Sequence, residues 1–278
     1  MQRAGHDTRM ADRSLDRQRA AVTGADILLL AVPTQTVRQV LERVADDIAE
    51  TLPVIICAKG LERETGSLLP DVVAEVLPRN PVGMLSGPNF AGEVARGLPA
   101  AAVLALPEAA MAEQWSARLG HAAFRLYASD DVTGVALGGA MKNVLAIAAG
   151  AVTGAGLGLN ARAAVISRGL AELRRLGRAL GARDETLSGL SGLGDLVLTC
   201  TDETSRNFAF GAALGRDADL PDVLVEGVHT VSPLLQRAAV LGIELPIASA
   251  VHEVLHLGVP LQQAISDLLS RPVGQSEG

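Results

Sequence analysis

The run VALGGAMKNVLAIAAG at residues 135–150 limits the choice of fold more than any other stretch of the chain. Apart from Lys142 and Asn143 it contains only apolar or small residues, and the large ones recur at helical spacing. Such a helix is buried on all sides, where a lysine rarely lies without a partner. Because burial lowers the pKa of an amine, the sequence predicts that Lys142 exchanges a proton near neutral pH in a catalytic site. The alternative is a lysine that snorkels out at the helix end.

Composition narrows the class of protein. With 278 residues, 49% hydrophobic and 20% charged, the chain predicts a soluble globular protein of one or two domains. The net charge of -7 gives no support to nucleic-acid binding. The distant Cys57 and Cys200 have no metal-type neighbours and indicate packing roles in a reducing compartment. No run approaches the roughly 20 apolar residues that span a bilayer, so we expect no membrane insertion and a cytoplasmic protein.

The pattern of apolar segments divides the chain in two near residue 130. Residues 1–24 are polar and without a signal-peptide core, which indicates a frayed helix or a disordered arm. Short apolar runs at 27–32, 54–58, 82–85, 101–105 and 124–127 then alternate with helical segments, as in a parallel sheet with crossover helices. From 131 onward only helical periodicity remains. The sequence therefore predicts an α/β domain over 25–130 and an all-helical domain over 131–278.

Several polar segments lie where a ligand would bind. Lys59-Gly60 and the segment 87–91, GPNFA, each follow an expected strand, and ligands of α/β sheets bind beyond the carboxyl ends of the strands. Either loop alone is equally typical of an ordinary turn. In the helical half, GLSGLG leads into Asp195, which would orient a lysine or hydroxyl, or merely cap a helix. Ser205-Arg206-Asn207 at a helix start suits a phosphate monoester, or equally a capped surface helix.

Taken together, these segments carry a family resemblance. SGPNFAGEVARGLPAA, GGAMKNVLAIAAG, NARAAVISRGLAELRRLG, GLSGLGDLVLTCTDETSRNFAFG and VEG closely resemble, in this order, the bacterial glycerol-3-phosphate dehydrogenase family, which uses NAD or NADP. The resemblance runs from about residue 26 to about residue 257. It implies a Rossmann-type dinucleotide-binding domain before the helical substrate and catalytic domain. It also implies that the chain interconverts dihydroxyacetone phosphate and sn-glycerol 3-phosphate for glycerophospholipid synthesis.

The resemblance also implies a role for individual residues. Lys142 would be the proton donor and acceptor of the catalytic step. Residues implied to bind the substrate are Lys59, Gly87, Asn89, Lys142, Asp195, Ser205, Arg206 and Asn207. Residues implied to approach the dinucleotide are Lys59, Ala91, Arg206, Leu224 and Glu226. In this scheme Lys142 protonates the developing alkoxide while the phosphate anchors the substrate.

Three features depart from the family pattern. Asn89 stands where Thr or Ser is usual, although an amide still donates a hydrogen bond. Leu224 stands where valine is usual, with little expected consequence. The third is larger, because no strand followed by G-x-G-x-x-G precedes residue 26, so the predicted sheet is truncated and the strand at 27–32 has a free edge. Either the start is misassigned or the chain is a degenerate product, which as written would bind the dinucleotide weakly or not at all.

Two rival functions stay open. His252-Glu253-Val254-Leu255-His256 matches the zinc-hydrolase pattern H-E-x-x-H, but short patterns match by chance, and no obvious third ligand follows beyond Asp267 and Glu277. Packing or surface histidines are the preferred interpretation, so no metal is expected. The second rival is a catalytically impaired relative that acts as a phosphate-binding or dimerising module. The sequence leaves open the choice between NAD and NADP and the pairing of chains into a homodimer.

Overall fold

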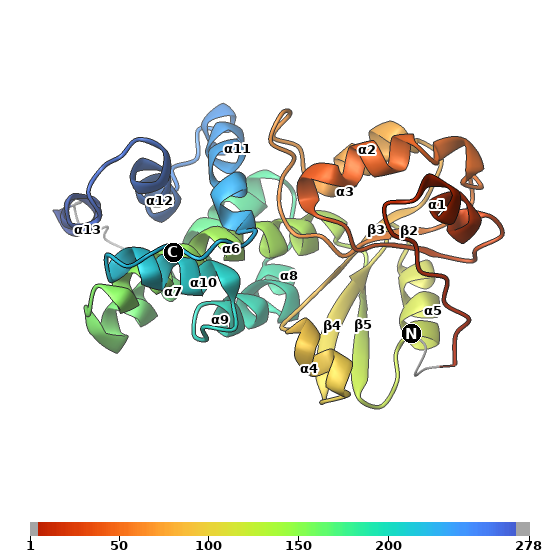
Figure 1. The fold of residues 1–278 in the computed structure, drawn as a ribbon, viewed down its shortest axis with the longest axis horizontal. Coiled ribbons are helices and arrows are strands. Elements are labelled where there is room, and N and C mark those ends of the chain that lie inside the picture. Colours follow the sequence, from red (N-terminus) through yellow and green to blue (C-terminus); the bar gives the residue numbers. More distant parts are fainter. Residues whose placement is uncertain (1–4, 271–278) are drawn as a thin grey trace.

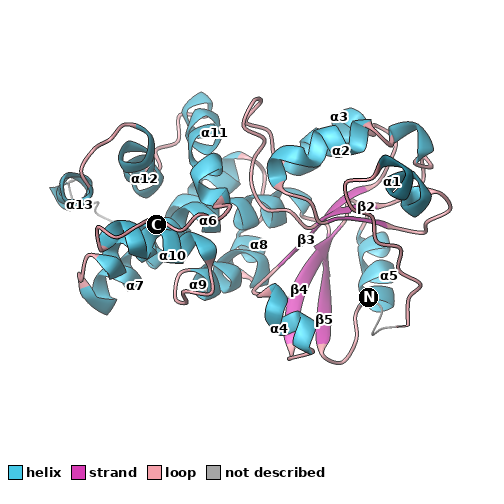
Figure 2. Cartoon of the chain, in the orientation of Figure 1, coloured by secondary structure: helices cyan, strands magenta, loops and turns pink. Residues whose placement is uncertain are grey.

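The protein has an α/β half that contains a five-stranded sheet and a half built only of helices. The computed structural model describes residues 5–270. Figure 1 shows the sheet and its covering helices on the right and the later helices on the left. Figure 2 shows that the strands are confined to the first of these two regions. The last strand ends at Ser129 and the first helix of the second half begins at Val132.

The sheet has the strand order β1-β2-β3-β4-β5. Its strands are Leu28–Leu30, Val54–Ile56, Val82–Ser86, Ala100–Ala105 and Phe124–Ser129, close to the five predicted runs. Strands β1, β2 and β3 are parallel, as are β4 and β5, but β3 and β4 are antiparallel. The predicted parallel sheet is therefore confirmed, with one antiparallel pair within it. The connection over residues 87–99 reverses the chain, so β4 runs back alongside β3.

Helices cover both faces of the sheet, because side chains of successive strand residues point to opposite faces. One face packs Leu30 and Ile56 into the main core with helices α2 and α3. The other packs Ile55 and Leu104 against Trp115 of α5 in a smaller core. The helices of this half are α1 (Leu15–Val22), α2 (Val37–Glu42), α3 (Leu69–Val76), α4 (Ala91–Arg96) and α5 (Ala109–Leu119). Helix α1 lies in the predicted polar arm, and α4 was not predicted.

Strand β1 lies at the edge of the sheet. The predicted free edge at this strand is therefore confirmed for the described residues. The division of the chain at residues 24 and 130 into arm and domains stays a prediction.

Helix α6 (Val132–Gly154) is the axis of the helical half. Asp131 caps it by accepting the Gly134 N–H at 2.7 Å, and 17 of its 23 residues are buried. The other helices pack around it and are α7 (Gly158–Ala179), α8 (Asp184–Ser188), α9 (Asp195–Thr199), α10 (Arg206–Gly215), α11 (Glu226–Val240), α12 (Pro246–His256) and α13 (Leu261–Ser270). Helix α8 was not predicted. Residues 190–199 form a π-helical turn, Leu190–Gly194, followed directly by α9.

Glycine pairs let α6 and α10 approach closely. A Cβ on Gly150 would lie 2.1 Å from the Phe208 carbonyl oxygen, and one on Gly211 would lie 2.1 Å from the Ile147 carbonyl oxygen. Gly154 and Gly215, one turn further along each helix, are as tightly placed. Larger residues at these positions would push the helices apart, so the glycines fix the position of α10 relative to Lys142.

The length of α6 corrects one statement made from the sequence. With 23 residues and a mean hydropathy of 1.6 over its most apolar window, α6 is long and apolar enough to cross a bilayer. However, 94% of that window is buried inside the protein. Helix α6 therefore has the burial of a core helix.

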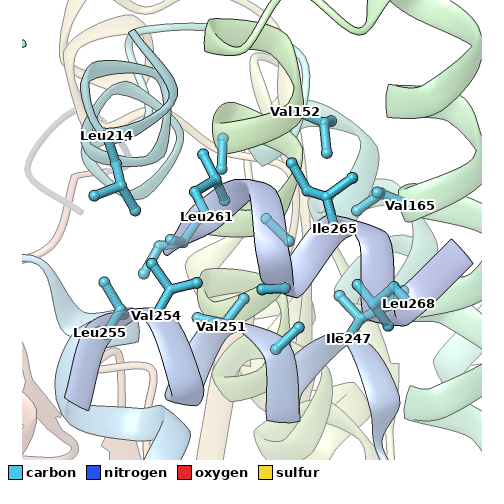
Figure 3. Close-up of a pocket in the computed structure, with 15 residues that line it drawn as sticks. Val152, Val165, Leu214, Ile247, Val251, Val254, Leu255, Leu261, Ile265 and Leu268 are labelled. Carbon is cyan, nitrogen blue, oxygen red and sulfur yellow. The ribbon is translucent and has the colours of Figure 1, made fainter. Parts of the chain in front are cut away.

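An apolar cavity of about 50 Å³ lies between α6, α7, α10, α12 and α13. Figure 3 shows Val251 and Val254 of α12 facing Leu261 and Ile265 of α13 across it. All the residues that line it are Ala, Val, Leu or Ile. Helix α13 thus rests on apolar side chains that do not completely fill the space beneath it.

Candidate active site

Lys142 lies in the middle of α6 and is 8% exposed. Its Nζ donates to Asp195 Oδ1 at 2.5 Å and to Thr199 Oγ1 at 2.9 Å. The side chain therefore stays inside the protein and has partners there, which excludes the alternative of a snorkelling lysine. Because Lys142 is the one charged residue of a helix that is apolar all round, the sequence alone identified it as a buried amine.

Asp195 joins two lysines from different halves of the molecule. It is 1% exposed, and its second oxygen, Oδ2, accepts from Lys59 Nζ at 2.5 Å. Lys59 comes from the loop after β2 and also donates to the Gly87 carbonyl at 3.3 Å. The π-helical turn Leu190–Gly194 precedes Asp195 directly, and such turns occur frequently at functional sites. The carboxylate of Asp195, which follows this turn, therefore lies between Lys142 of α6 and Lys59 of the loop after β2, and it pairs with both ammonium groups.

The charges of this cluster tune Lys142. Burial, reinforced by the neighbouring Lys59 charge and opposed by Asp195, lowers the pKa of Lys142 to about 8. Although burial alone would raise it, the two lysines hold the pKa of Asp195 below its ordinary value. With both lysines protonated the cluster carries one excess positive charge, which favours an anionic ligand. The predicted lowering of the Lys142 pKa is confirmed.

The loop after β3 comes close to Lys59 but holds its own polar side chain inward. Gly87 is buried, and a Cβ there would lie 2.8 Å from Ala102 Cα, so this close approach to β4 requires glycine. Asn89 donates from Nδ2 to the Ala101 carbonyl at 3.0 Å, while its Oδ1 is buried without a partner. One amide hydrogen of Asn89 is therefore engaged within the protein, and its contact with substrate stays a prediction.

The start of α10 places three predicted residues in different environments. Ser205 is the N-cap of α10, and its Oγ accepts the Phe208 N–H at 3.3 Å. Arg206 is exposed. Asn207 is 8% exposed, donates to Asn143 Oδ1 at 3.0 Å and accepts the Gly227 N–H at 2.9 Å. The capping alternative is thus realised by Ser205, while Arg206 is an exposed cation at the same helix end, and its contact with a phosphate stays a prediction.

Glu226 at the start of α11 links the two halves of the site. Its Oε1 accepts the backbone N–H of Thr34, in the loop after β1, at 3.3 Å, and its Oε2 is buried without a partner. Leu224, in the preceding loop, and Ala91, at the start of α4, are both exposed. Their proposed contacts with a dinucleotide, like that of Glu226, stay predictions.

Several segments that contribute to the site carry buried polar side-chain atoms without partners. Among the described residues they include Thr34 Oγ1, Ser86 Oγ, Asn89 Oδ1, Ser191 Oγ and Glu226 Oε2. An unmade hydrogen bond at a buried group costs about 1–3 kcal/mol, which a ligand or ordered water regains. A site that binds a hydrogen-bonding ligand, such as a dinucleotide at its reacting end, fits this arrangement.

Sequence reasoning missed two residues of the cluster. Thr199 contacts Lys142, and it follows Asp195 by four residues, so both lie on one helical face. Asn143, next to Lys142, is 5% exposed and donates to the Lys59 carbonyl at 3.3 Å. The spacing of Thr199 from Asp195 was a usable signal, but the sequence held none for the partner of Asn143.

The H-E-x-x-H segment lies on α12. The rings of His252 and His256 are 5.1 Å apart, and His256 Nε2 is 3.1 Å from the Val228 carbonyl oxygen. Within residues 5–270, no group of three or more His, Cys, Asp or Glu side chains is arranged to hold a metal ion. His256 is thus engaged with the α11 backbone.

Comparison with known proteins gives concordant matches in both halves. Residues 13–112 match the family model of the NAD-dependent glycerol-3-phosphate dehydrogenase N-terminus, and residues 131–266 match that of the C-terminus. Among curated relatives, glycerol-3-phosphate dehydrogenase [NAD(P)+] of Mesorhizobium japonicum is 51% identical over 255 residues, 91% of this chain and 74% of the relative. That of Rhodospirillum rubrum is also 51% identical, over 259 residues, with the same two shares.

Solved structures give the same similarity. The 2.1 Å crystal structure of glycerol-3-phosphate dehydrogenase from Coxiella burnetii has a TM-score of 0.86 and 40% identity, covering 91% of this chain and 79% of the other. The structure of glycerol-3-phosphate dehydrogenase from Saccharomyces cerevisiae, 24% identical, has a TM-score of 0.81 over 94% of this chain and 79% of that one, which shows the fold alone.

Proposed function

Because the chain belongs to the NAD-dependent glycerol-3-phosphate dehydrogenase family, we propose that it interconverts dihydroxyacetone phosphate and sn-glycerol 3-phosphate with NAD(P). The observation that carries this proposal is the buried cluster of Lys142, Asp195 and Lys59. The cluster combines an ammonium group of lowered pKa, Lys142, with one excess positive charge. This combination suits the reduction of a ketone on an anionic substrate. The product would serve glycerophospholipid synthesis.

Lys142 is the proposed acid and base. With a pKa of about 8, its ammonium is mostly protonated at neutral pH and holds a proton for the substrate oxygen that gains negative charge. The neutral amine, present above that pH, accepts the proton of the alcohol in the reverse direction. Asp195 holds Lys142 in place from one oxygen and Lys59 from the other.

The helix start at α10 is the proposed phosphate anchor. Arg206 provides a planar guanidinium that pairs two donors with two phosphate oxygens. Ser205 and Asn207 flank it on the backbone, and anions are stabilised at helix N-termini. Lys59, Gly87 and Asn89 complete the proposed substrate contacts from the sheet side. Fixing the phosphate there holds the small carbonyl group in position beside Lys142.

The cofactor, when bound, supplies or removes the hydride. The residues that fit its reacting end are Glu226, with one buried carboxylate oxygen still without a partner, and the exposed cation Arg206. Lys59, Ala91 and Leu224 are the other proposed contacts. Among residues 5–270, no G-x-G-x-x-G turn follows a strand, so the proposal for the cofactor concerns the residues around the nicotinamide end.

The test is oxidation of NADH and of NADPH at 340 nm with dihydroxyacetone phosphate by the 278-residue chain. We expect turnover that is lost in Lys142→Met, whose unbranched side chain is one atom shorter and carries no titratable proton. A folded wild-type chain that binds and turns over neither cofactor would overturn the proposal. The matched control is Arg79→Met, which removes an exposed cation whose ion pair with Glu50 lies on the surface of the α/β half. We expect this control to keep the wild-type rate.

Three further properties belong to the same proposal. We place the protein in the cytoplasm, the compartment that suits two unpaired cysteines. We propose that residues 25–130 form the dinucleotide-binding domain and residues 131–278 the catalytic one. Pairing into a homodimer is the proposed assembly, and sedimentation of the purified chain tests it.

A further inference from the structure

Two buried amides connect opposite ends of the site. The Gly227 N–H donates to Asn207 Oδ1 at 2.9 Å, and Asn207 Nδ2 donates to Asn143 Oδ1 at 3.0 Å. Asn143 Nδ2 in turn donates to the Lys59 carbonyl at 3.3 Å. The two asparagines are 8% and 5% exposed. An unbroken line of hydrogen bonds thus runs from the start of α11, through α10 and α6, to the loop after β2.

The hydrogen bonds of this line can be donated in only one direction, from Gly227 toward Lys59. It begins at a backbone N–H, which can only donate, and ends at a backbone carbonyl, which can only accept. An amide that flipped would place oxygen against oxygen or N–H against N–H on both of its sides. Asn143 and Asn207 therefore hold each other in a single orientation, and a displacement of one end is transmitted to the other.

The ends of the line lie beside the two binding regions of the proposed enzyme. Gly227 follows Glu226, whose carboxylate contacts Thr34 and carries an oxygen without a partner. Lys59 at the other end shares Asp195 with Lys142. Gly227 also packs directly on α6, because a Cβ there would lie 2.6 Å from the Asn143 carbonyl oxygen. The start of α11 therefore cannot shift without disturbing Asn143.

We propose that Asn143 and Asn207 form an amide relay, in which they are positioning residues that couple the cofactor end at Glu226 to the substrate end at Lys59 and Lys142. The inference rests on the proposed function and adds a role that direct substrate contact by Asn207 does not include. Oδ1 and one N–H of Asn207 belong to the relay, so one N–H remains for the substrate. Binding at one end then changes the affinity at the other, reciprocally.

The first test measures this coupling without turnover. Calorimetry gives the Kd of NADH alone and with saturating sn-glycerol 3-phosphate, a pair of ligands between which no hydride can pass. In the wild type we expect the two values to differ by about fivefold or more, the low end of typical coupling. Asn143→Leu and Asn207→Leu, which keep volume and charge, reduce the ratio to below about twofold. The double variant does no more, because a chain broken once is already broken.

Asn80→Leu is the matched control. Asn80 donates to the Ala49 and Leu52 carbonyls in the α/β half, so its loss removes two hydrogen bonds away from the relay. We expect reduced stability and the wild-type ratio. A wild-type ratio of one, or an unchanged ratio in both relay variants, overturns the relay and leaves the proposed function intact. Additive losses in the double variant also overturn it.

A second test needs no ligand. The titration of Lys142, followed by NMR of lysine labelled with 13C at Cε and assigned with Lys142→Met, has its midpoint near pH 8 in the wild type. If the relay positions Lys59, the midpoint moves in Asn207→Leu although the substitution removes no charge. An unchanged midpoint overturns the relay. Failure of the wild type to bind either ligand overturns the proposed function, and this midpoint still decides the relay.

Discussion

Replacing Lys59 by methionine changes the charge that Lys142 experiences and little else of its surroundings. In the structure both ammonium groups contact one carboxylate at 2.5 Å, on different oxygens. At a separation of roughly 5 Å and an effective dielectric constant near 20, two unit charges repel by about 3 kcal/mol. Since 1.36 kcal/mol corresponds to a tenfold change in proton affinity, the pKa of Lys142 rises by roughly two in Lys59→Met.

The assay is the pH dependence of kcat/KM for oxidation of sn-glycerol 3-phosphate, which reports the free enzyme. This direction needs the neutral amine of Lys142, so the wild-type rate increases as pH rises through about 8. In Lys59→Met we expect the midpoint to move up by roughly two pH units. The absolute rate also falls, because Lys59 is a proposed substrate contact, but the position of the midpoint does not depend on that loss.

Asp195→Asn provides the opposite change. Asp195 raises the pKa of Lys142, so its neutral replacement moves the midpoint below that of the wild type. A midpoint that stays in place or moves down in Lys59→Met would refute the electrostatic reasoning. Movement in the same direction for both variants would indicate a change of structure instead of a change of charge.

Three further predictions concern stability. Burial raises the pKa of Glu172 from 4.5 to about 7. Its contribution to the free energy of unfolding, about 3 kcal/mol, is therefore present below pH 4.5 and is lost as pH rises through 7. Urea unfolding at a series of pH values measures this loss, and an equal pH dependence in Glu172→Gln would contradict it. Ala250→Val, which adds two methyl groups beside the 50 Å³ cavity, stabilises by up to about 1 kcal/mol, measured as a higher Tm; a lower Tm would mean that the cavity cannot accept them. In Gly211→Ala the added Cβ would lie 2.1 Å from the Ile147 carbonyl oxygen, so we expect the free energy of unfolding to fall by about 2 kcal/mol. Unchanged unfolding in urea would show that α6 and α10 can move apart without cost.

The sequence by itself determined the elements and the identity of the key amine. Alternating apolar runs placed all five strands, because buried strands and amphipathic helices have different periods. A largely apolar helix with a single charged residue singled out Lys142, because burying a charge without a partner is costly. Both signals are local, because each can be read from a short run of neighbouring residues.

Only the tertiary structure decided which groups meet. Asp195 follows Lys142 by 53 residues and Lys59 by 136, and no local pattern specifies such a contact. The antiparallel pairing of β3 with β4 depends on the path of a connection, which hydrophobic periodicity does not record. The same holds for the amides of Asn143 and Asn207, whose partners, apart from each other, come from two other segments. The sequence gives the chemical type of each side chain. The pKa and the orientation of that side chain depend on neighbours that folding brings together.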